Sequence, residues 1–130
     1  MNSFNMFAVY GRPVRSTVQP QETKTGKTYT RFTLACDESY TNRNGQRVEK
    51  ISHFRVVVWG EPGRELKRMV AAADIVLIVV GRLEQRSWLD KHGNNKTVVE
   101  VIAEKIGVSM MDAPTERDTA AEAPFTDEPA

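Results

Sequence analysis

The feature that most constrains the fold is the arrangement of side chains over residues 51–59. Phe54, Val56 and Val58 occupy alternate positions, and the positions between and after them include Arg55 and Trp59. Because successive side chains of a strand point to opposite faces, this pattern predicts a strand with one apolar face and one face that places an aromatic ring beside cations. The apolar face needs a core. The other face suits single-stranded nucleic acid, whose bases stack on flat rings while its phosphates attract positive groups.

A second segment repeats this arrangement, with Arg82, Arg86 and Trp88 in phase on one face of a strand. An isolated tryptophan in a strand is usually part of the core. Here the residues in phase with the tryptophans are arginines, which are costly to bury. We therefore interpret Trp59 and Trp88 as surface residues on which bases stack.

The chain has five segments with strand patterns and one with a helical pattern. Apolar residues recur at i, i+3, i+4 and i+7 from Leu66 to Ala73, which predicts a short amphipathic helix. Gly81 allows a bend or bulge in its strand. The helix falls between the third and fourth of the predicted strands, which span residues 4–18, 28–37, 51–59, 75–88 and 97–108. This order predicts an all-β fold with one short helix, a five-stranded oligonucleotide-binding (OB) barrel.

Turn residues separate these segments. The Asn-Gly pair at 44–45 predicts an exposed polar loop over residues 41–47. The glycines and proline of residues 60–63 predict a break that ends the third strand. Residues 91–95 predict a hairpin turn into the fifth strand. Cys36 follows the inward phase of the second strand and is expected to be a buried, small apolar residue.

The first strand carries apolar residues on both of its faces. If its side chains alternate between the two faces, one apolar row fills the barrel interior. The other row would be exposed to water and would tend to bind other apolar surfaces. The two rows are Phe4, Met6, Ala8 and Tyr10 on one face, and Phe7 and Val9 on the other. We therefore expect the chain to associate with copies of itself.

The net charge of +1 hides a strong asymmetry along the chain. Residues 1–110 hold 17 Lys and Arg against 11 Asp and Glu, a net charge of +6, whereas residues 111–130 hold one Arg against six acids, a net charge of −5. The basic part predicts a polyanionic partner. The remainder, rich in Ala, Thr, Pro, Asp and Glu, buries too little apolar surface to fold, so we expect a binding domain over 1–110 and a short disordered acidic tail over 111–130.

Several functional classes are disfavoured by the sequence. The longest apolar run, residues 75–80, is too short for a membrane span, and the N-terminus lacks the features of a secretory signal, so we expect an intracellular protein. One cysteine and two separated histidines form neither a disulfide nor a metal site. The chain shows no nucleophile with its base, no carboxylate pair and no phosphate-binding loop, so we expect neither an enzyme nor a cofactor.

Motifs in five successive segments resemble the bacterial single-stranded DNA-binding protein family. The resemblance covers residues 4 to about 110, in order and with the spacings of the family. The motifs are Val9-Tyr10-Gly11-Arg12, the segment from Phe32 to Tyr40, Arg55-Val56-Val57-Val58-Trp59-Gly60, the segment from Gly81 to Trp88, and the segment from Lys96 to Val101 with Ile106-Gly107.

The resemblance implies which residues contact DNA. The base-stacking aromatic positions of the family fall on Tyr40, His53, Trp59 and Trp88, with Tyr40 and His53 standing where many members carry tryptophan. An imidazole offers less stacking area than an indole and can gain charge at low pH. The basic positions fall on Arg43, Arg55, Arg86 and Lys96, to which the strand pattern adds Arg31 and Arg82.

The resemblance also implies a function and partners. It implies a protein, most often a homotetramer, that coats single-stranded DNA in the cytoplasm during replication, recombination and repair. Members commonly end in acidic residues and a terminal Pro-Phe that docks onto replication and repair proteins. Here Phe125 is internal and precedes Asp127 and Glu128, which fits a plasmid, phage or secondary chromosomal version.

Two other functions stay open at this point. The first is an OB-fold protein-interaction subunit of a replication-restart or primosomal assembly, with weak nucleic-acid contact. The second is binding of RNA, because stacking and phosphate contacts do not report the 2′-hydroxyl.

Overall fold

The computed structural model describes residues 3–110 and 115–116. The helical elements are α1 (Glu61–Ala72) and a 3₁₀ turn, Arg15–Thr17. The strands are β1 (Phe7–Pro13), β2 (Gln19–Glu22), β3 (Thr28–Asp37), β4 (Tyr40–Thr41), β5 (Arg47–Val48), β6 (Ile51–Trp59), β7 (Ala73–Asp74), β8 (Leu77–Leu89), β9 (Asn95–Val108) and β10 (Thr115–Glu116). Within the described ranges, no helix combines the length and the apolar character needed to cross a bilayer.

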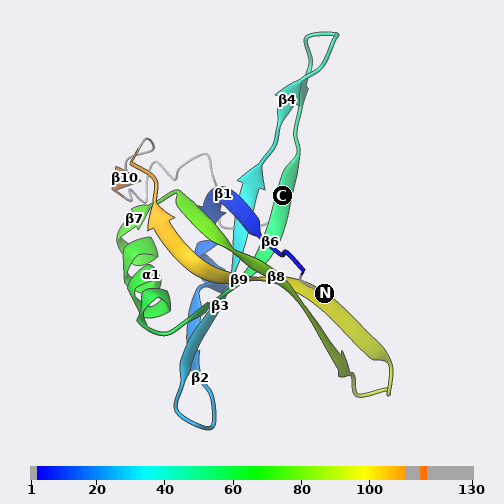
Figure 1. The fold of residues 1–130 in the computed structure, drawn as a ribbon. Helices are drawn as coiled ribbons and strands as arrows, with labels where there is room; N and C mark the ends of the chain where they lie inside the picture. The colour runs from blue at the N-terminus through cyan, green and yellow to red at the C-terminus, as the bar shows by residue number, and fades with distance from the viewer. Residues whose placement is uncertain (1–2, 111–114, 117–130) are drawn as a thin grey trace.

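Five strands close into a ring in the order β1-β8-β9-β6-β3 (Figure 1). The ring is completed where β1 returns to β3, with Arg12 opposite Ala35. The β6–β9 pair is parallel, whereas the other pairs of the ring are antiparallel. The expected fold class, an all-β five-stranded OB barrel with one short helix, is therefore confirmed, since the described residues form this closed ring and a single α-helix.

Alternation along the strands builds the core. Val56 and Val58 of β6 are buried, as are Phe32 and Leu34 of β3, in agreement with the phases expected from the sequence. The helix α1 adds its own apolar stripe, in which Leu66 and Val70 are buried in the same cluster. Cys36 lies at the margin of this cluster and is only partly buried. Its burial raises the pKa of the thiol, and the nearby charges of Glu38 and Asp37 raise it further.

Several element boundaries differ from the sequence-based expectation. The expected strand over 4–18 ends at Pro13, which has no N–H to donate, and a 3₁₀ turn then leads into β2 as a separate strand. Residues 61–63 form the first turn of α1, where the fixed φ of Pro62 is favourable, and are not a loop. The expected loop over 41–47 contains the short β4–β5 ladder, closed by backbone N–H groups of Asn44 and Gln46 that donate to the side chain of Asn42.

The expected irregularity at Gly81 is confirmed. The register of the β8–β9 pair shifts between Val80 and Gly81. At this point the two backbones approach so closely that a Cβ atom on Gly81 would lie 1.9 Å from the carbonyl oxygen of Ile102. Only glycine fits such an approach without displacement of a strand.

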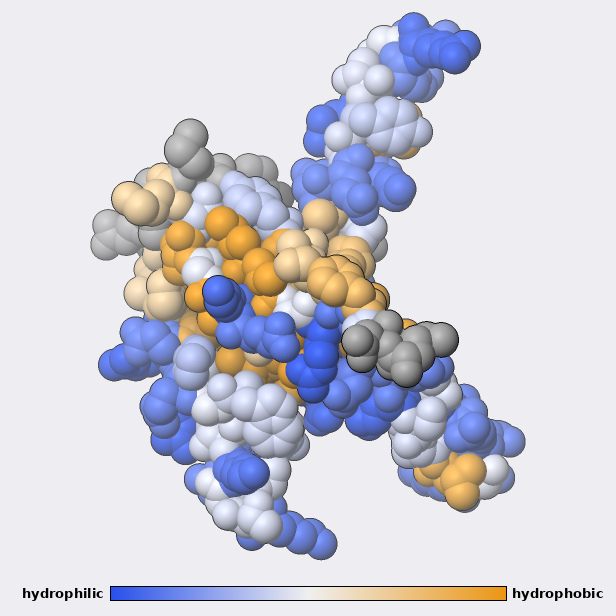
Figure 2. All heavy atoms as spheres, in the orientation of Figure 1, coloured by the Kyte–Doolittle hydropathy of each residue, from blue (hydrophilic) through white to orange (hydrophobic). Residues whose placement is uncertain are grey.

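The β2–β3, β4–β5 and β8–β9 hairpins project from the barrel (Figure 1). Figure 2 shows hydrophilic residues over much of these projections, whereas apolar residues gather on the body between them. The body therefore holds the core, and the projections extend a largely polar surface around it.

Candidate nucleic-acid interface

Both tryptophans lie on the surface of the protein. Trp59, at the end of β6, is 50% exposed, and Trp88, near the tip of the β8–β9 hairpin, is 39% exposed. The alternative in which they belong to the barrel core is therefore wrong. Their positions leave part of each indole available to a flat ligand.

Trp59 packs against a tyrosine of the neighbouring strand. Tyr29 lies opposite it in the β3–β6 register, and their ring centroids are 5.4 Å apart at an interplanar angle of 46°. The Tyr29 hydroxyl donates to Oε1 of Gln21 at 2.7 Å, which fixes the ring from the β2 side. The aromatic residue that packs against Trp59 is thus Tyr29.

Two arginines meet at one buried carboxylate. The Nε atom of Arg31 donates to Oε2 of Glu100 at 3.2 Å, and Nε of Arg86 donates to Oε1 of the same residue at 3.2 Å. The side chain of Glu100 is 4% exposed, whereas those of Arg31 and Arg86 are 43% and 39% exposed. The carboxylate is therefore covered by the two guanidinium groups, which themselves reach solvent.

Each of these arginines also lies over an aromatic ring. The guanidinium carbon of Arg31 is 5.2 Å from the centroid of Tyr29, and that of Arg86 is 4.6 Å from the centroid of Trp88. Cations over aromatic faces at such distances attract the ring quadrupole. Residues from β3, β6, β8 and β9 thus form one continuous set of contacts, which we term the Trp59–Trp88 network: Trp59, Tyr29, Arg31, Glu100, Arg86 and Trp88.

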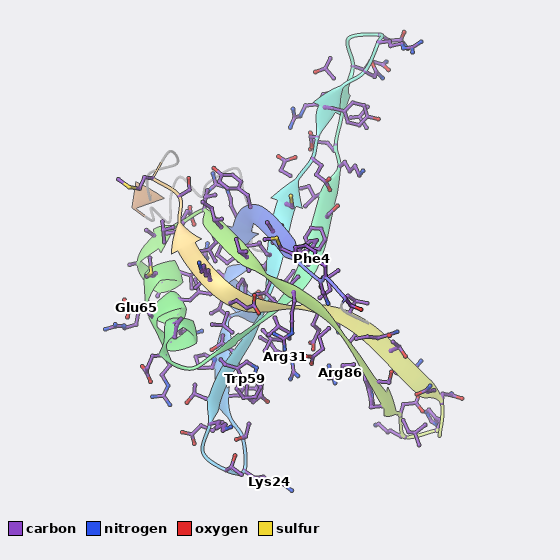
Figure 3. The ribbon with its side chains drawn as sticks, viewed as in Figure 1. Phe4, Lys24, Arg31, Trp59, Glu65 and Arg86 are labelled. Carbon is purple, nitrogen blue, oxygen red and sulfur yellow. The ribbon has the colours of Figure 1, made fainter. Side chains whose placement is uncertain are left out.

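Figure 3 shows Trp59, Arg31 and Arg86 projecting from the same side of the barrel, between the β2–β3 and β8–β9 hairpins. Glu65, in contrast, lies on α1 away from them. The network therefore offers aromatic rings and cationic groups along one face. Its chemistry suits a ligand that alternates flat rings with anionic groups.

Three of the remaining basic candidates, Arg55, Arg82 and Lys96, flank this network. Arg55 lies on β6 opposite Thr33 and is exposed. Arg82 forms ion pairs with Glu84 at 3.3 Å and Glu104 at 3.6 Å. Lys96 lies opposite Trp88 in the β8–β9 register, and its Nζ is 3.9 Å from Oδ2 of Asp90.

Two candidates lie apart from the network. Tyr40 belongs to β4 and is 53% exposed, and Arg43 lies in the turn between β4 and β5. Their hairpin projects from the barrel as a separate arm (Figure 1). A ligand that contacts both the network and Tyr40 must therefore extend from the barrel onto this arm.

His53 has a different environment from the other aromatic candidates. It is partly buried, and its Nε2 atom is inaccessible and lacks a hydrogen-bond partner. The residue lines a groove of about 430 Å³ together with Phe7, Phe54, Arg55, Leu83, Val98, Val99 and Val101. His53 therefore offers less free ring surface than the two tryptophans. The candidates Phe125, Asp127 and Glu128 lie outside the described residues.

Sequence reasoning did not select two members of the network. Tyr29 lies on the outward face of β3, two positions before Arg31, and this position was the only indication in the sequence that it could belong to the interface. Glu100 lies between valines in β9, and a single acid in an otherwise apolar run was its only signal. Neither signal identifies a partner, because the partners come from other strands.

Comparison with known proteins places this interface in context. The chain matches the model described as "Single-strand binding protein family" over residues 4–109. It is 27% identical over 106 residues to single-stranded DNA-binding protein 2 of Chlorobaculum tepidum, a match that covers 82% of this chain and 71% of that one. Identity to single-stranded DNA-binding protein 1 of Clostridium acetobutylicum is 29%, covering 78% and 90%. Identity to the single-stranded DNA-binding protein of Deinococcus radiodurans is 31%, covering 65% of this chain and 27% of that one.

Solved structures show the same fold. A Plasmodium falciparum SSB in complex with ssDNA matches with a TM-score of 0.62 at 23% identity, covering 83% of this chain and 95% of that one. A deletion mutant of the single-stranded DNA binding protein from Thermus aquaticus matches with a TM-score of 0.61 at 26% identity, covering 82% and 50%. The overall fold is therefore shared with these proteins.

Proposed function

This chain belongs to the single-strand binding protein family, and from that premise we propose that it coats single-stranded DNA without strong sequence preference. The observation that carries the proposal is the Trp59–Trp88 network, in which two exposed indoles flank a pair of arginines on one face. The activity is binding rather than catalysis. It protects exposed single strands from reannealing and from nucleases during replication, recombination and repair.

The geometry supports binding of any base sequence. Bases stack on Trp59 and Trp88 through their ring faces, which every base possesses, while Arg31, Arg86 and Arg55 attract phosphates. Exposed indoles of this kind favour nucleic-acid contact over a purely protein-binding subunit. Comparing binding of equal-length single-stranded DNA, duplex DNA and RNA, by anisotropy of a labelled strand, tests the proposal. Preference for duplex, or equal weak binding of all three, contradicts it.

Affinity is expected to fall steeply with salt, because each neutralised phosphate releases counterions. For single strands, log K falls against log[salt] with a slope of about −0.7 per phosphate contact. Arg55 is exposed, and no ion pair of Arg55 is found among the described residues. Arg55→Ala should therefore make the slope less negative by about 0.7, as measured by anisotropy titrations at several salt concentrations.

A matched control for this prediction lies on α1. Arg68 is also exposed but pairs with Glu65 on the helix, away from the network. Arg68→Ala should leave the slope unchanged. An affinity of the parent protein that is independent of salt would rule out phosphate contacts.

The outer face of β1 and β8 supports self-association. Phe7 and Val9 point to the core, whereas Ala8 and Tyr10 of the other row are exposed. In the β1–β8 register Tyr10 lies opposite Ile78, and these two side chains are 47% and 41% exposed. Burial of such an apolar row between copies of the chain would stabilise a homo-oligomer, for which we propose a tetramer.

We expect the parent protein to sediment as an oligomer at micromolar concentration. Ile78→Glu should shift it to a smaller species, because a charge buried in an apolar interface lacks a partner. Leu89→Glu is the control, since Leu89 is 70% exposed at the end of the β8–β9 hairpin and should not change the sedimentation coefficient. A parent protein that sediments as a monomer would contradict this assignment.

We further propose that residues 1–110 form the binding domain and residues 111–130 an acidic tail. The net charges of +6 and −5 support this division. In the tail, Phe125, Asp127 and Glu128 would contact replication and repair proteins. Since exposed single strands arise where the chromosome is copied and repaired, we place the protein in the cytoplasm with the nucleoid.

A further inference from the structure

Glu100 is an unusual residue for a surface that binds phosphates. Its carboxylate lies almost fully buried on the cationic face, where an anion opposes the binding of another anion. A buried charge is also costly unless it is paired. Both of its oxygens are occupied, one by Arg31 and one by Arg86. The carboxylate thus joins two arginines that lie 55 positions apart in the sequence, on strands β3 and β8.

The contact uses the inner nitrogen of each arginine. Both hydrogen bonds run from Nε, at 3.2 Å, so neither terminal amino nitrogen of either guanidinium takes part in them. Each guanidinium is held a second time by the aromatic ring beneath it, Tyr29 for Arg31 and Trp88 for Arg86. An arginine held at Nε and against a ring keeps few rotamers, and no hydrogen bond from the terminal N–H groups of Arg31 or Arg86 is found within residues 3–110, so these groups can receive an anion.

From these contacts we propose that Glu100 is a positioning residue, which holds the guanidinium groups of Arg31 and Arg86 so that their terminal nitrogens receive the phosphates of the bound strand. The proposal rests on the proposed function of single-strand binding. It assigns to a buried acid a favourable role in the binding of a polyanion. Both arginine side chains are already ordered in the free protein. Binding of the strand therefore does not include the entropic cost of ordering them.

Simple electrostatics predicts the opposite sign. If Glu100 acted only through its charge, its neutralisation would make the face more positive and binding tighter, most clearly at low salt. If it positions the arginines, neutralisation weakens binding. The sign of the effect therefore separates the two roles.

The test is Glu100→Gln in the full chain, with binding of a fluorescein-labelled oligo-dT measured by anisotropy. Glutamine has nearly the same shape but a single acceptor oxygen, so it can accept from one Nε and opposes the other with its own N–H groups. We expect binding about tenfold weaker, the factor that loss of one charge-assisted hydrogen bond brings. The slope of log K against log[salt] should also become less negative, which a change in folding stability alone does not cause. Binding that is equal to or tighter than that of the parent overturns the proposal.

Glu84 provides the matched control. It lies directly opposite Glu100 in the β8–β9 register, but it is exposed and pairs with Arg82. Glu84→Gln removes the same charge from the same face without touching Arg31 or Arg86. It should leave binding unchanged or make it slightly tighter. Equal weakening by both substitutions would overturn the proposal, because the effect would then not depend on the two arginines.

A second variant keeps the test decisive if Glu100→Gln does not fold. Arg86→Lys keeps the charge and can keep the ion pair, but its single ammonium group would be occupied by Glu100 and would leave no separate terminal nitrogens for phosphate. We expect binding several-fold weaker with an unchanged thermal midpoint. Parent-like binding by this variant overturns the proposal. Failure of the parent itself to bind oligo-dT would instead refute the proposed function.

Discussion

Alanine in place of Trp88 or Trp59 should weaken binding of poly-dT by ~1–3 kcal/mol each. Both indoles are partly exposed, and each is held by a neighbour on one side, Arg86 for Trp88 and Tyr29 for Trp59. A base that stacks on either ring gains a rigid platform, which alanine removes. The double substitution should approach the sum of the two losses, provided that the two rings contact different bases.

The measurement is an anisotropy titration of labelled poly-dT, which stays valid when the tryptophans are removed. In the parent, poly-dT should also quench tryptophan fluorescence. Leu89→Ala serves as the control, because Leu89 is a large exposed apolar residue on the same hairpin but has no ring. If both tryptophan variants fold and bind as tightly as the parent, stacking on these residues is excluded.

Gly81→Ala should destabilise the fold by about 3 kcal/mol, at the upper end of the cost of overpacking. The added methyl group would lie 1.9 Å from a backbone carbonyl oxygen of β9, and backbone cannot move aside as a flexible side chain can. The β8–β9 pair must then separate or shift its register. Because this pair carries Arg86 and Trp88 opposite Val98 and Lys96, DNA binding should weaken as well.

Urea unfolding measures this loss, and the partner strand offers the control. In the part of the chain that the structure describes, no atom lies within 4 Å of a Cβ added to Gly107 of β9, which is exposed. Gly107→Ala should change the free energy of unfolding by less than about 0.5 kcal/mol. Equal urea midpoints for Gly81→Ala and Gly107→Ala would mean that the close approach of the β8 and β9 backbones at Gly81 does not limit the stability of the barrel.

The least predictable feature of the interface was which residues contact one another. The sequence shows that Trp59 shares a face with Arg55, since both follow the period of one strand. The ring that actually contacts Trp59 is Tyr29, because the β3–β6 register places them opposite each other. The alternation of side chains along one strand shows on which face a residue lies. The residue beside it depends on the pairing register of two strands, which one strand alone does not show.

Local patterns in the sequence determined the five strands of the barrel, the helix α1, the bulge at Gly81 and the outward direction of Trp59 and Trp88. These follow from side-chain period and from the conformational freedom of glycine, which act over a few residues. The same alternation places Glu100 on the face of its strand opposite to Val101, but it does not show whether the carboxylate is exposed or buried. Only the tertiary structure decides that Glu100 is buried, because Arg31 and Arg86, from 69 and 14 positions away, close over it once the barrel forms. Contacts of that range depend on barrel closure and strand register, which no local pattern encodes.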